Sequence, residues 1–412
     1  MSDARSAYWW REVDAGAWRA LGAAGAGWML DAMDVTLYII ALGSIGAEFA
    51  LTKAESGGVA SATLVASAVG GVASGVLADR FGRVRMLMVS VMTYSVFTAL
   101  TATSQSLAQL VFWRVLVGIG MGGEWSAGAV LVAETWPARH RGKAIGLMQS
   151  GWAIGYILAA VLGALILPRW GWRALFLVGF APAILTIWIR RRVAEPAAWR
   201  ELEPRRAHGF GALAMLARPP LRGRAVIATA TTAALLFAYW GLFTWVPTYL
   251  ASRDAGGAGM GIVKSTAWII PMQIGAFFGY SSFGFLADRY GRRPTFIAFV
   301  LGAAAIVPIY GASARSEATL MILGPLIGFL GHGYFSVFGA MLAELFPSEV
   351  RGTAQGFCYN AGRAASALAP WAIGSLADRH GLGYALGTTS FLYLVGAGLV
   401  LMLPETRGKE IA

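Results

Sequence analysis

The chain of 412 residues contains one cysteine and few charged residues for its length. Because Cys358 stands alone, no disulfide can form within the chain, and nothing in the sequence demands an oxidising compartment. Charged residues make up 13% of the sequence and hydrophobic residues 57%, and the mean hydropathy is +0.61. This composition leaves too little polar surface for a fold in water. It therefore indicates an integral membrane protein.

The sequence motifs of metal-dependent and nucleophilic catalysis are missing as well. The chain contains no HExxH, CxxC or Walker sequence, and no metal-ligand spacing relates the histidines at 140, 208, 332 and 380. Residues 118–123 spell GxGxxG, but a dinucleotide site needs a strand before it, and here the surrounding run is apolar. We therefore expect no enzyme activity, no metal and no cofactor.

The sequence instead contains twelve apolar runs, each long enough to cross about 30 Å of hydrocarbon. They lie near 20–47, 57–78, 86–103, 107–135, 143–167, 172–189, 225–250, 261–287, 294–313, 317–345, 352–376 and 382–403. Between the sixth and seventh, residues 190–224 carry nine arginines and are too polar to span. We expect an all-α membrane protein whose six-helix bundles, 1–189 and 225–412, are joined by a cytoplasmic linker, 190–224.

An internal repeat relates the two halves. Gly75-Val-Leu-Ala-Asp79-Arg80-Phe-Gly82-Arg83 returns 209 residues later as Gly284-Phe-Leu-Ala-Asp288-Arg289-Tyr-Gly291-Arg292, with seven of nine positions identical. Glu134-x-x-Pro137-x-x-x-Arg141-Gly142 returns 210 residues later as Glu344-x-x-Pro347-x-x-x-Arg351-Gly352. Each copy of the first motif separates two apolar runs, so it predicts a tight charged turn between helices. The repeat predicts two pseudo-symmetric bundles.

The distribution of lysine and arginine predicts the orientation in the membrane. If both termini are cytoplasmic, 24 of the 33 basic residues lie inside and seven outside, while Arg114 and Arg363 lie within helices. Because cytoplasmic loops are enriched in basic residues, we expect a multi-pass protein of a bacterial-type inner (plasma) membrane with both termini inside. This topology also accounts for the net charge of +12, so we expect no nucleic-acid partner. We expect a monomer in the lipid bilayer.

The repeated turns at 75–83 and 284–292 resemble those of the major facilitator superfamily, and the resemblance covers essentially the whole chain. Further similar motifs are Arg114-x-x-x-Gly118-x-Gly120, Glu195-Pro196 and Pro404-Glu405-Thr406-Arg407-Gly408, of which the last is similar to the closing motif of sugar porters. The resemblance implies twelve helices, a binding cavity between the bundles near the midplane, and secondary transport by alternating access.

Two further motifs resemble one group within that superfamily. Trp28-x-x-Asp31-Ala32-x-Asp34 and Gly120-Met-Gly122-Gly123-Glu124-Trp125 are most similar to proton symporters of organic acids, which include sialate, aromatic-acid and nicotinate transporters. The resemblance implies symport of a small organic anion with the proton as coupling ion. Three alternatives within transport or binding remain: a neutral sugar or polyol porter, a drug or metabolite efflux carrier, and a sensor that binds without translocating.

Three carboxylates are candidates for the proton site. Asp31 and Asp34 lie three residues apart, about 60° from each other on one helical face. Glu124 lies in the fourth run among glycines that would let another helix approach, and we expect Asp31 or Asp34 as its neighbour. An ionised carboxylate at membrane depth is costly, so such a group faces water, pairs with a cation or takes up a proton. The alternative is a structural carboxylate bonded to a neighbouring helix.

Arg363 is the sharpest candidate for contact with substrate. It lies near the middle of the eleventh run, and its guanidinium does not readily lose its proton, so it needs an anion. That anion is either a substrate carboxylate or a resident acid. We expect the other residues that line the cavity to come from the polar and aromatic side chains at similar depth: Arg114, Trp152, Tyr156, Trp240, Gln273, Tyr359 and Asn360.

The charged residues of the repeated turns are candidates for gating. Asp79 and Asp288 can accept hydrogen bonds from helix N-termini across the halves, Arg83 and Arg292 can pair with Glu134 and Glu344, and Glu195 can meet Arg141. Such contacts would hold the cytoplasmic side closed in one state of the carrier. The full set of expected gating residues is Asp79, Arg80, Arg83, Glu134, Arg141, Glu195, Asp288, Arg289, Arg292, Glu344 and Arg351.

Overall fold

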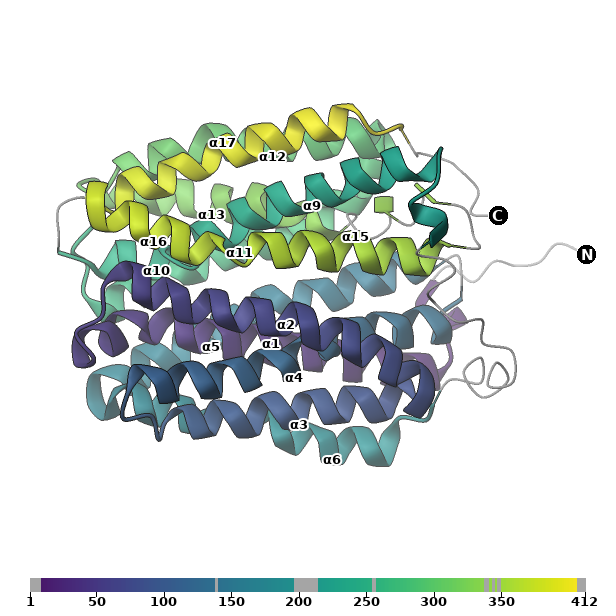
Figure 1. Cartoon of the computed structure of the whole chain (residues 1–412), viewed down its shortest axis with the longest axis horizontal. Helices are drawn as coiled ribbons and strands as arrows, with labels where there is room; N and C mark the ends of the chain where they lie inside the picture. Colours follow the sequence, from purple (N-terminus) through teal and green to yellow (C-terminus); the bar gives the residue numbers. More distant parts are fainter. Residues whose placement is uncertain are drawn as a thin grey trace, which may run out of the picture.

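The computed structural model describes residues 9–137, 140–195, 214–253, 257–336, 341–342, 345–346 and 350–405. In these residues every regular element is a helix. Figure 1 shows two layers of long, roughly parallel helices, with the first half of the chain in one layer and the second half in the other. We call the end of the molecule at which α1 and α9 begin the proximal end, and the opposite end the distal end.

The first layer holds six α-helices after a short 3-10 helix at Trp9–Glu12. They are α1 (Ala15–Glu48), α2 (Lys53–Phe81), α3 (Arg83–Thr101), α4 (Leu107–Thr135), α5 (Arg141–Val178) and α6 (Pro182–Arg192). Side-chain caps fix where several begin, among them Asp14 for α1, Thr52 with Glu55 for α2, and Ser106 for α4. The glycines at 118 and 122 let α4 pack closely on α2, since a Cβ at either position would collide with an α2 carbonyl oxygen.

The second layer holds α9 (Leu221–Phe243), α10 (Val246–Ala251), α11 (Ile262–Tyr290), α12 (Arg292–Ala312), α13 (Glu317–Gly333), α15 (Arg351–Ser366), α16 (Ala369–His380) and α17 (Leu382–Leu401). Two of the expected continuous runs are broken here. The run at 225–250 divides into α9 and α10 just before Pro247, and the run at 352–376 divides into α15 and α16 just before Pro370. Proline lacks an N–H donor and its ring clashes with the preceding turn, which accounts for both breaks.

Nine helical segments in the described part of the chain are long and apolar enough to cross a membrane. One of them, Lys143–Arg192, contains both the fifth and the sixth expected run. The helix α13 and the broken pair α15 and α16 fall outside the nine, because α13 ends at Gly333 and the pair is interrupted. Large apolar side chains such as Phe285 and Phe391 are exposed on the molecule, as expected for a surface in contact with lipid.

Glycines with positive φ mark the same place in each quarter of the chain. Gly82, Gly171, Gly291 and Gly381 have φ values of 112°, 73°, 104° and 83°. Each lies at the boundary between the second and third helices of a three-helix unit, where a side chain would strain the backbone. Gly82 and Gly291 lie at the proximal end, and Gly171 and Gly381 at the distal end. The repeat visible between the halves therefore extends to four units.

The two layers meet along two seams. On one, α2 lies against α15 and α16, and on the other, α5 lies against α11. Trp245, which is fully buried, donates from Nε1 to the carbonyl oxygen of Pro370 at 3.0 Å. The helices at these seams, together with α1, α4 and α9, surround the middle of the molecule.

Candidate functional site

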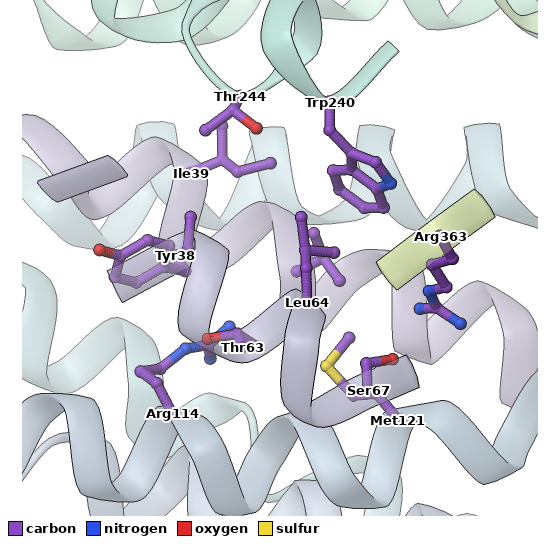
Figure 2. Close-up of a pocket in the computed structure, with 12 residues that line it drawn as sticks. Tyr38, Ile39, Thr63, Leu64, Ser67, Arg114, Met121, Trp240, Thr244 and Arg363 are labelled. Carbon is purple, nitrogen blue, oxygen red and sulfur yellow. The ribbon is translucent and has the colours of Figure 1, made fainter. Parts of the chain in front are cut away.

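A small cavity lies between the two layers. It has a volume of about 30 Å³ and is lined by residues of α1, α2, α4, α9 and α15, with Thr244 just beyond α9. The cavity has room for little more than water, so the halves meet closely around it. A larger hollow of about 500 Å³ lies between them at the distal end, lined by α1, α2, α10 and the start of α11. Figure 2 shows that Arg114 and Arg363 both belong to its wall, with Leu64 between them. Arg114 comes from the first half and Arg363 from the second.

Arg363 is held at the cavity without an ionic partner in direct contact. Its side chain is 8% exposed, and no hydrogen bond or ion pair joins it to any residue that the structure describes. Asp31 of α1 lies within electrostatic range of the guanidinium. The sequence leaves open whether a substrate or a resident acid neutralises Arg363. The structure places Asp31 as the resident acid near it, yet leaves the guanidinium available to a ligand.

Arg114 has a partner. Its Nη1 lies 3.5 Å from Oδ2 of Asp34, and both side chains are almost completely buried. The guanidinium also lies over the ring of Tyr38, 4.9 Å from its centroid, and the Tyr38 hydroxyl donates to the carbonyl oxygen of Ser56 at 2.9 Å. The α1 and α4 helices are therefore joined by an ion pair. A buried charge without a partner would be strongly destabilising, so each of these two groups stabilises the other.

Glu124 packs against α1 one turn from Asp31. A Cβ at Gly27 would collide with Glu124 Oε1, so the missing side chain makes room for the carboxylate. Both Glu124 oxygens and Asp31 Oδ1 are buried without a hydrogen-bond partner among the described residues. Tyr94 of α3 lies within electrostatic range of Asp31, Asp34 and Glu124, and its hydroxyl is also buried without such a partner. The three expected carboxylates thus form one cluster, to which Tyr94 adds a residue that the sequence analysis does not identify.

Of the four aromatic candidates, Trp240 lines the cavity, and two others form hydrogen bonds that join the halves. Trp152 donates from Nε1 to the Tyr239 hydroxyl at 2.8 Å, and Tyr156 donates to the Phe243 carbonyl oxygen at 3.3 Å. Both bonds run from α5 to α9. In this closed arrangement Trp152 and Tyr156 therefore hold the bundles together at the level of the cavity.

The remaining three candidates do not line the cavity. Tyr359, one helical turn before Arg363, stacks on Trp125 with 4.6 Å between ring centroids, so the two rings join α15 to α4. Asn360 donates from Nδ2 to the Gly356 carbonyl oxygen of its own helix at 3.0 Å. Gln273 is fully buried, and neither of its amide atoms has a partner among the described residues.

Charged contacts at the proximal end involve several of the expected gating residues. Arg83 Nη2 lies 3.1 Å from Glu134 Oε1, joining the start of α3 to the end of α4. The Glu195 carboxylate accepts hydrogen bonds from the backbone N–H groups of Arg83, Val84 and Arg85 at 2.8–3.1 Å. Glu195 therefore caps the N-terminus of α3, where its charge is favourable. A contact with Arg141 cannot be described, because that side chain lies outside the described residues.

The second half repeats this cap. Glu405 accepts from the backbone N–H groups of Arg292 and Arg293 at 3.0 Å each, at the start of α12. Glu195 and Glu405, which lie 210 residues apart, thus cap the N-termini of corresponding helices. This gives the closing Pro404-Glu405 motif a structural role. Arg289 is exposed and its guanidinium lies 5.3 Å from the Tyr290 ring centroid. The side chains of the other expected gating residues lie outside the described ones: Asp79, Arg80, Arg141, Asp288, Glu344 and Arg351.

At the distal end, the structure reveals a contact across the halves that the sequence analysis misses. Asp378 of α16 accepts hydrogen bonds from the backbone N–H groups of Lys53 and Ala54, at 3.1 and 2.9 Å, and so caps α2 from the opposite bundle. Asp378 belongs to Gly374-Ser-Leu-Ala-Asp378-Arg379-His-Gly381, a third copy of the repeated turn motif. A search for that motif in the last third of the chain would have found it.

Comparison with known proteins now identifies the family. The family model described as Major Facilitator Superfamily matches residues 25–283 and 258–411, which together cover most of the chain. The chain belongs to the major facilitator superfamily. The resemblance expected from the repeated turns is confirmed.

Several relatives within the superfamily carry names that state a substrate. A protein of Cupriavidus pinatubonensis named "Probable 4-methylmuconolactone transporter" is 35% identical over 390 residues, covering 93% of this chain and 90% of the relative. A cis,cis-muconate transport protein of Acinetobacter baylyi is 33% identical over 373 residues, covering 89% of each chain. A niacin transporter of the same organism is 29% identical and covers 94% of each. These relatives are transport proteins, so the expectation that the chain is no enzyme is confirmed.

Solved structures of the superfamily have the same fold. The crystal structure of a D-xylose-proton symporter matches with a TM-score of 0.78 at 18% identity, covering 96% of this chain and all of that one. The expected fold class, an all-α membrane protein of the major facilitator type, is confirmed by this match and by the family. The protein is a multi-pass membrane protein and a secondary transporter of the superfamily type.

Proposed function

We propose that the protein is a proton-coupled symporter that carries a small organic anion, a monocarboxylate or an aromatic or sugar acid, by alternating access. The observation that carries this proposal is Arg363, a buried guanidinium on the cavity wall with no direct ionic partner in the described structure. A membrane-buried arginine costs several kcal/mol unless an anion or water accompanies it. A substrate carboxylate can accept two parallel hydrogen bonds from guanidinium, which gives both affinity and orientation.

The carboxylate cluster supplies the coupling. Asp31 lies within electrostatic range of Arg363, so a substrate anion that binds the arginine weakens the attraction between the guanidinium and the Asp31 carboxylate. Asp31 and its neighbour Glu124 then hold a proton more strongly in the loaded carrier than in the empty one. Asp34 is a third candidate for the proton, but its ion pair with Arg114 favours its charged form. Binding of anion and binding of proton thus favour one another.

The contacts at the two ends fit an alternating cycle in a bacterial inner membrane. The proximal end, which faces the cytoplasm in the proposed orientation, holds Arg83 with Glu134, and the distal end holds Asp378 on α2. Each contact of this kind contributes only a modest free energy. This suits a carrier, because the free energies of its inward-open and outward-open states must lie within a few kcal/mol of each other. Asp79 and Asp288 remain proposed latch residues at the cytoplasmic end.

The relatives support an organic anion over a neutral sugar. Their names include a muconate and a niacin transporter, and both substrates carry carboxylates. The sequence feature that favoured a sugar was the closing Pro404–Gly408 motif, and Glu405 of that motif caps α12. The motif therefore has a structural explanation that does not involve substrate.

The experiment that tests the proposal compares an acid with its own amide. Melting temperatures of the purified protein would be measured with nicotinate, nicotinamide, cis,cis-muconate and xylose, since a ligand that binds the native state raises the melting temperature. We expect one or both acids to raise it and nicotinamide and xylose to leave it unchanged. Transport into proteoliposomes under an inward proton gradient then shows whether the substrate moves in the same direction as the protons. Equal shifts with nicotinate and nicotinamide, or a shift with xylose alone, would contradict the proposal, and accumulation driven only outward would indicate efflux.

A further inference from the structure

The buried charges of the transmembrane region do not balance. Asp31, Asp34 and Glu124 contribute three negative charges, and Arg114 and Arg363 contribute two positive ones, all on side chains no more than 8% exposed. The other buried side chains among the described residues that take part in ion pairs are Arg83 and His140, which lie at the proximal end and are paired with Glu134 and Glu12. With every group ionised, the cluster would therefore carry one net negative charge.

The groups that face this cluster do not supply the missing positive charge. Among the described residues, the facing titratable groups are Tyr94 from α3, Tyr38 from α1 itself and Tyr359 from α15, all of which are neutral phenols when protonated. The α2 helix contributes the uncharged Thr63 and Ser67 to the adjoining cavity, and α9 contributes Trp240. His332 of α13 packs against Tyr239, Phe243 and Tyr280 inside the second bundle.

An uncompensated charge inside a membrane protein is costly enough for the group to take up a proton. Among the described residues, Asp31 Oδ1 and both oxygens of Asp34 and Glu124 are buried without a hydrogen-bond donor, but only Asp34 has an arginine in ion-pair contact. The proton of the empty carrier is therefore assigned to the Asp31 and Glu124 pair. We infer that the carrier takes up one further proton for each negative charge on its substrate, so that empty and loaded forms have the same net charge. This inference rests on the proposed symport of organic anions and adds the proton count to it.

The same count sets an upper limit on substrate charge. Three carboxylates can hold three protons, and one is already bound in the empty carrier, which leaves two. A monoanion is therefore carried with one proton and a dianion with two, whereas a trianion would leave a net charge in the membrane. A dianion also has two partners available, since Arg114 and Arg363 line one cavity. In that state Asp34 leaves Arg114 to the second substrate carboxylate and takes the second proton.

The experiment measures protons and charge for two acids that differ by one carboxylate. The full chain is reconstituted in liposomes that contain a trapped pH dye, and a potassium gradient with valinomycin sets the membrane potential. Radiolabelled nicotinate and cis,cis-muconate are then supplied outside at equal external and internal pH. We expect one proton to enter with each nicotinate and two with each muconate. Accumulation should be equal, within about twofold, at zero and at about 100 mV inside-negative, where one uncompensated charge would shift it about 50-fold.

Paired variants sharpen the test. Asp31→Asn with Glu124→Gln leaves one carboxylate and two arginines, so nicotinate should enter without a proton and an inside-negative potential should slow its uptake. Asp34→Asn with Arg114→Gln removes one charge of each sign, so the nicotinate uptake that remains should stay insensitive to potential.

The outcomes separate the inference from the function on which it rests. If an acid enters but its accumulation by the wild-type protein follows the potential, or both acids bring the same number of protons, the charge rule is wrong and symport stands. If neither acid enters and neither raises the melting temperature, the proposed function is wrong and the charge rule falls with it.

Discussion

The two bundles repeat one another at their ends and differ in their interiors. At the ends, Gly82 and Gly291 make the same turn, and Glu195 and Glu405 make the same cap. Ser106 and Ser316 cap α4 and α13, which fixes an offset of 210 residues between these two helices. At that offset Arg114 corresponds to Gly324 and Glu124 to Tyr334. The buried charges of α4 have no counterpart in the second bundle.

For α15 the buried charge is in the second bundle and is missing from the first. Arg363 corresponds to Ala153 at the same offset. Its aromatic neighbours are Trp240, which lines the same cavity, and Tyr359, which lies within electrostatic range of it and stacks on Trp125 from the first bundle. Among the described residues, the first bundle thus provides the buried carboxylates, and the second provides Arg363, a buried cation without a direct ionic partner. The turns and caps at the ends are repeated, whereas the residues proposed for the proton site and for the anion site lie in different bundles.

The largest expected effect comes from removing the cation of the second bundle. Arg363→Gln should lower nicotinate affinity by about 100-fold or more, because truncating a buried charge partner costs roughly 2–5 kcal/mol. Arg363→Lys keeps the charge but loses the bidentate fork, so its affinity should be intermediate. Isothermal titration gives the affinities, with exposed Arg315→Gln as the control. If a folded Arg363→Gln protein binds nicotinate with normal affinity, the anion assignment is wrong and a neutral substrate is favoured.

The next effect concerns the carboxylates of the first bundle. Either member of the Asp31 and Glu124 pair can take the proton that enters with the substrate. The Asp31→Asn, Glu124→Gln double variant mimics permanent protonation of both, so its accumulation driven by a pH gradient should fall at least about tenfold, as expected for loss of a coupling free energy of 1–3 kcal/mol. Exchange of labelled for unlabelled nicotinate should survive, because the bundles still reorient when loaded. Glu317→Gln, a largely exposed side chain, is the control. Full accumulation by the double variant would place the proton elsewhere.

A smaller effect, on stability, tests whether Asp34 and Arg114 act as a pair. Removing one partner leaves a buried charge unpaired, so Arg114→Gln should destabilise the protein by roughly 3–5 kcal/mol. Adding Asp34→Asn should restore much of that loss. Melting temperatures of the two single variants and the double variant form the cycle, and strictly additive losses would show that the 3.5 Å contact does not couple them.

The smallest expected effect compares a cap across the bundles with a cap inside one. Asp378 joins α16 to α2, whereas Glu405 caps α12 within the second bundle. Asp378→Asn should weaken the distal closure by about 1 kcal/mol and change the transport rate while leaving nicotinate affinity within a few fold. Glu405→Gln removes the same kind of cap. It should lower the melting temperature but change the transport rate less than Asp378→Asn does. An equal change of rate in both would reject Asp378 as a latch between the halves.

Much of the fold follows from the sequence because membrane spans and repeated turns are local patterns. Apolar length predicts the helices, and the motif at 75–83 and its copy predict the turns. The breaks before Pro247 and Pro370 were missed because hydropathy does not register the lost N–H donor. Asp378 is readable from the sequence, because residues 374–381 form a third copy of the repeated turn motif.

The site is only partly predictable for a different reason. Sequence alone identifies Asp31, Asp34, Glu124, Arg114 and Arg363 as charges at membrane depth. Which acid meets which arginine depends on the rotation of α1 against α4 and on the approach of α15, and neither is encoded in a local spacing. The structure resolves the pairing of Asp34 with Arg114 and places Glu124 at Gly27.

The central claim is that anion binding in the second bundle draws a proton onto the first. The most direct measurement is isothermal titration of the purified protein with nicotinate at one pH in buffers of different ionisation enthalpy, because the slope of heat against that enthalpy gives the protons taken up on binding. The account predicts about one proton per nicotinate in the wild type and none in the Asp31→Asn, Glu124→Gln double variant. Binding heat that is independent of the buffer in the wild type, or a proton uptake unchanged in the double variant, would contradict it.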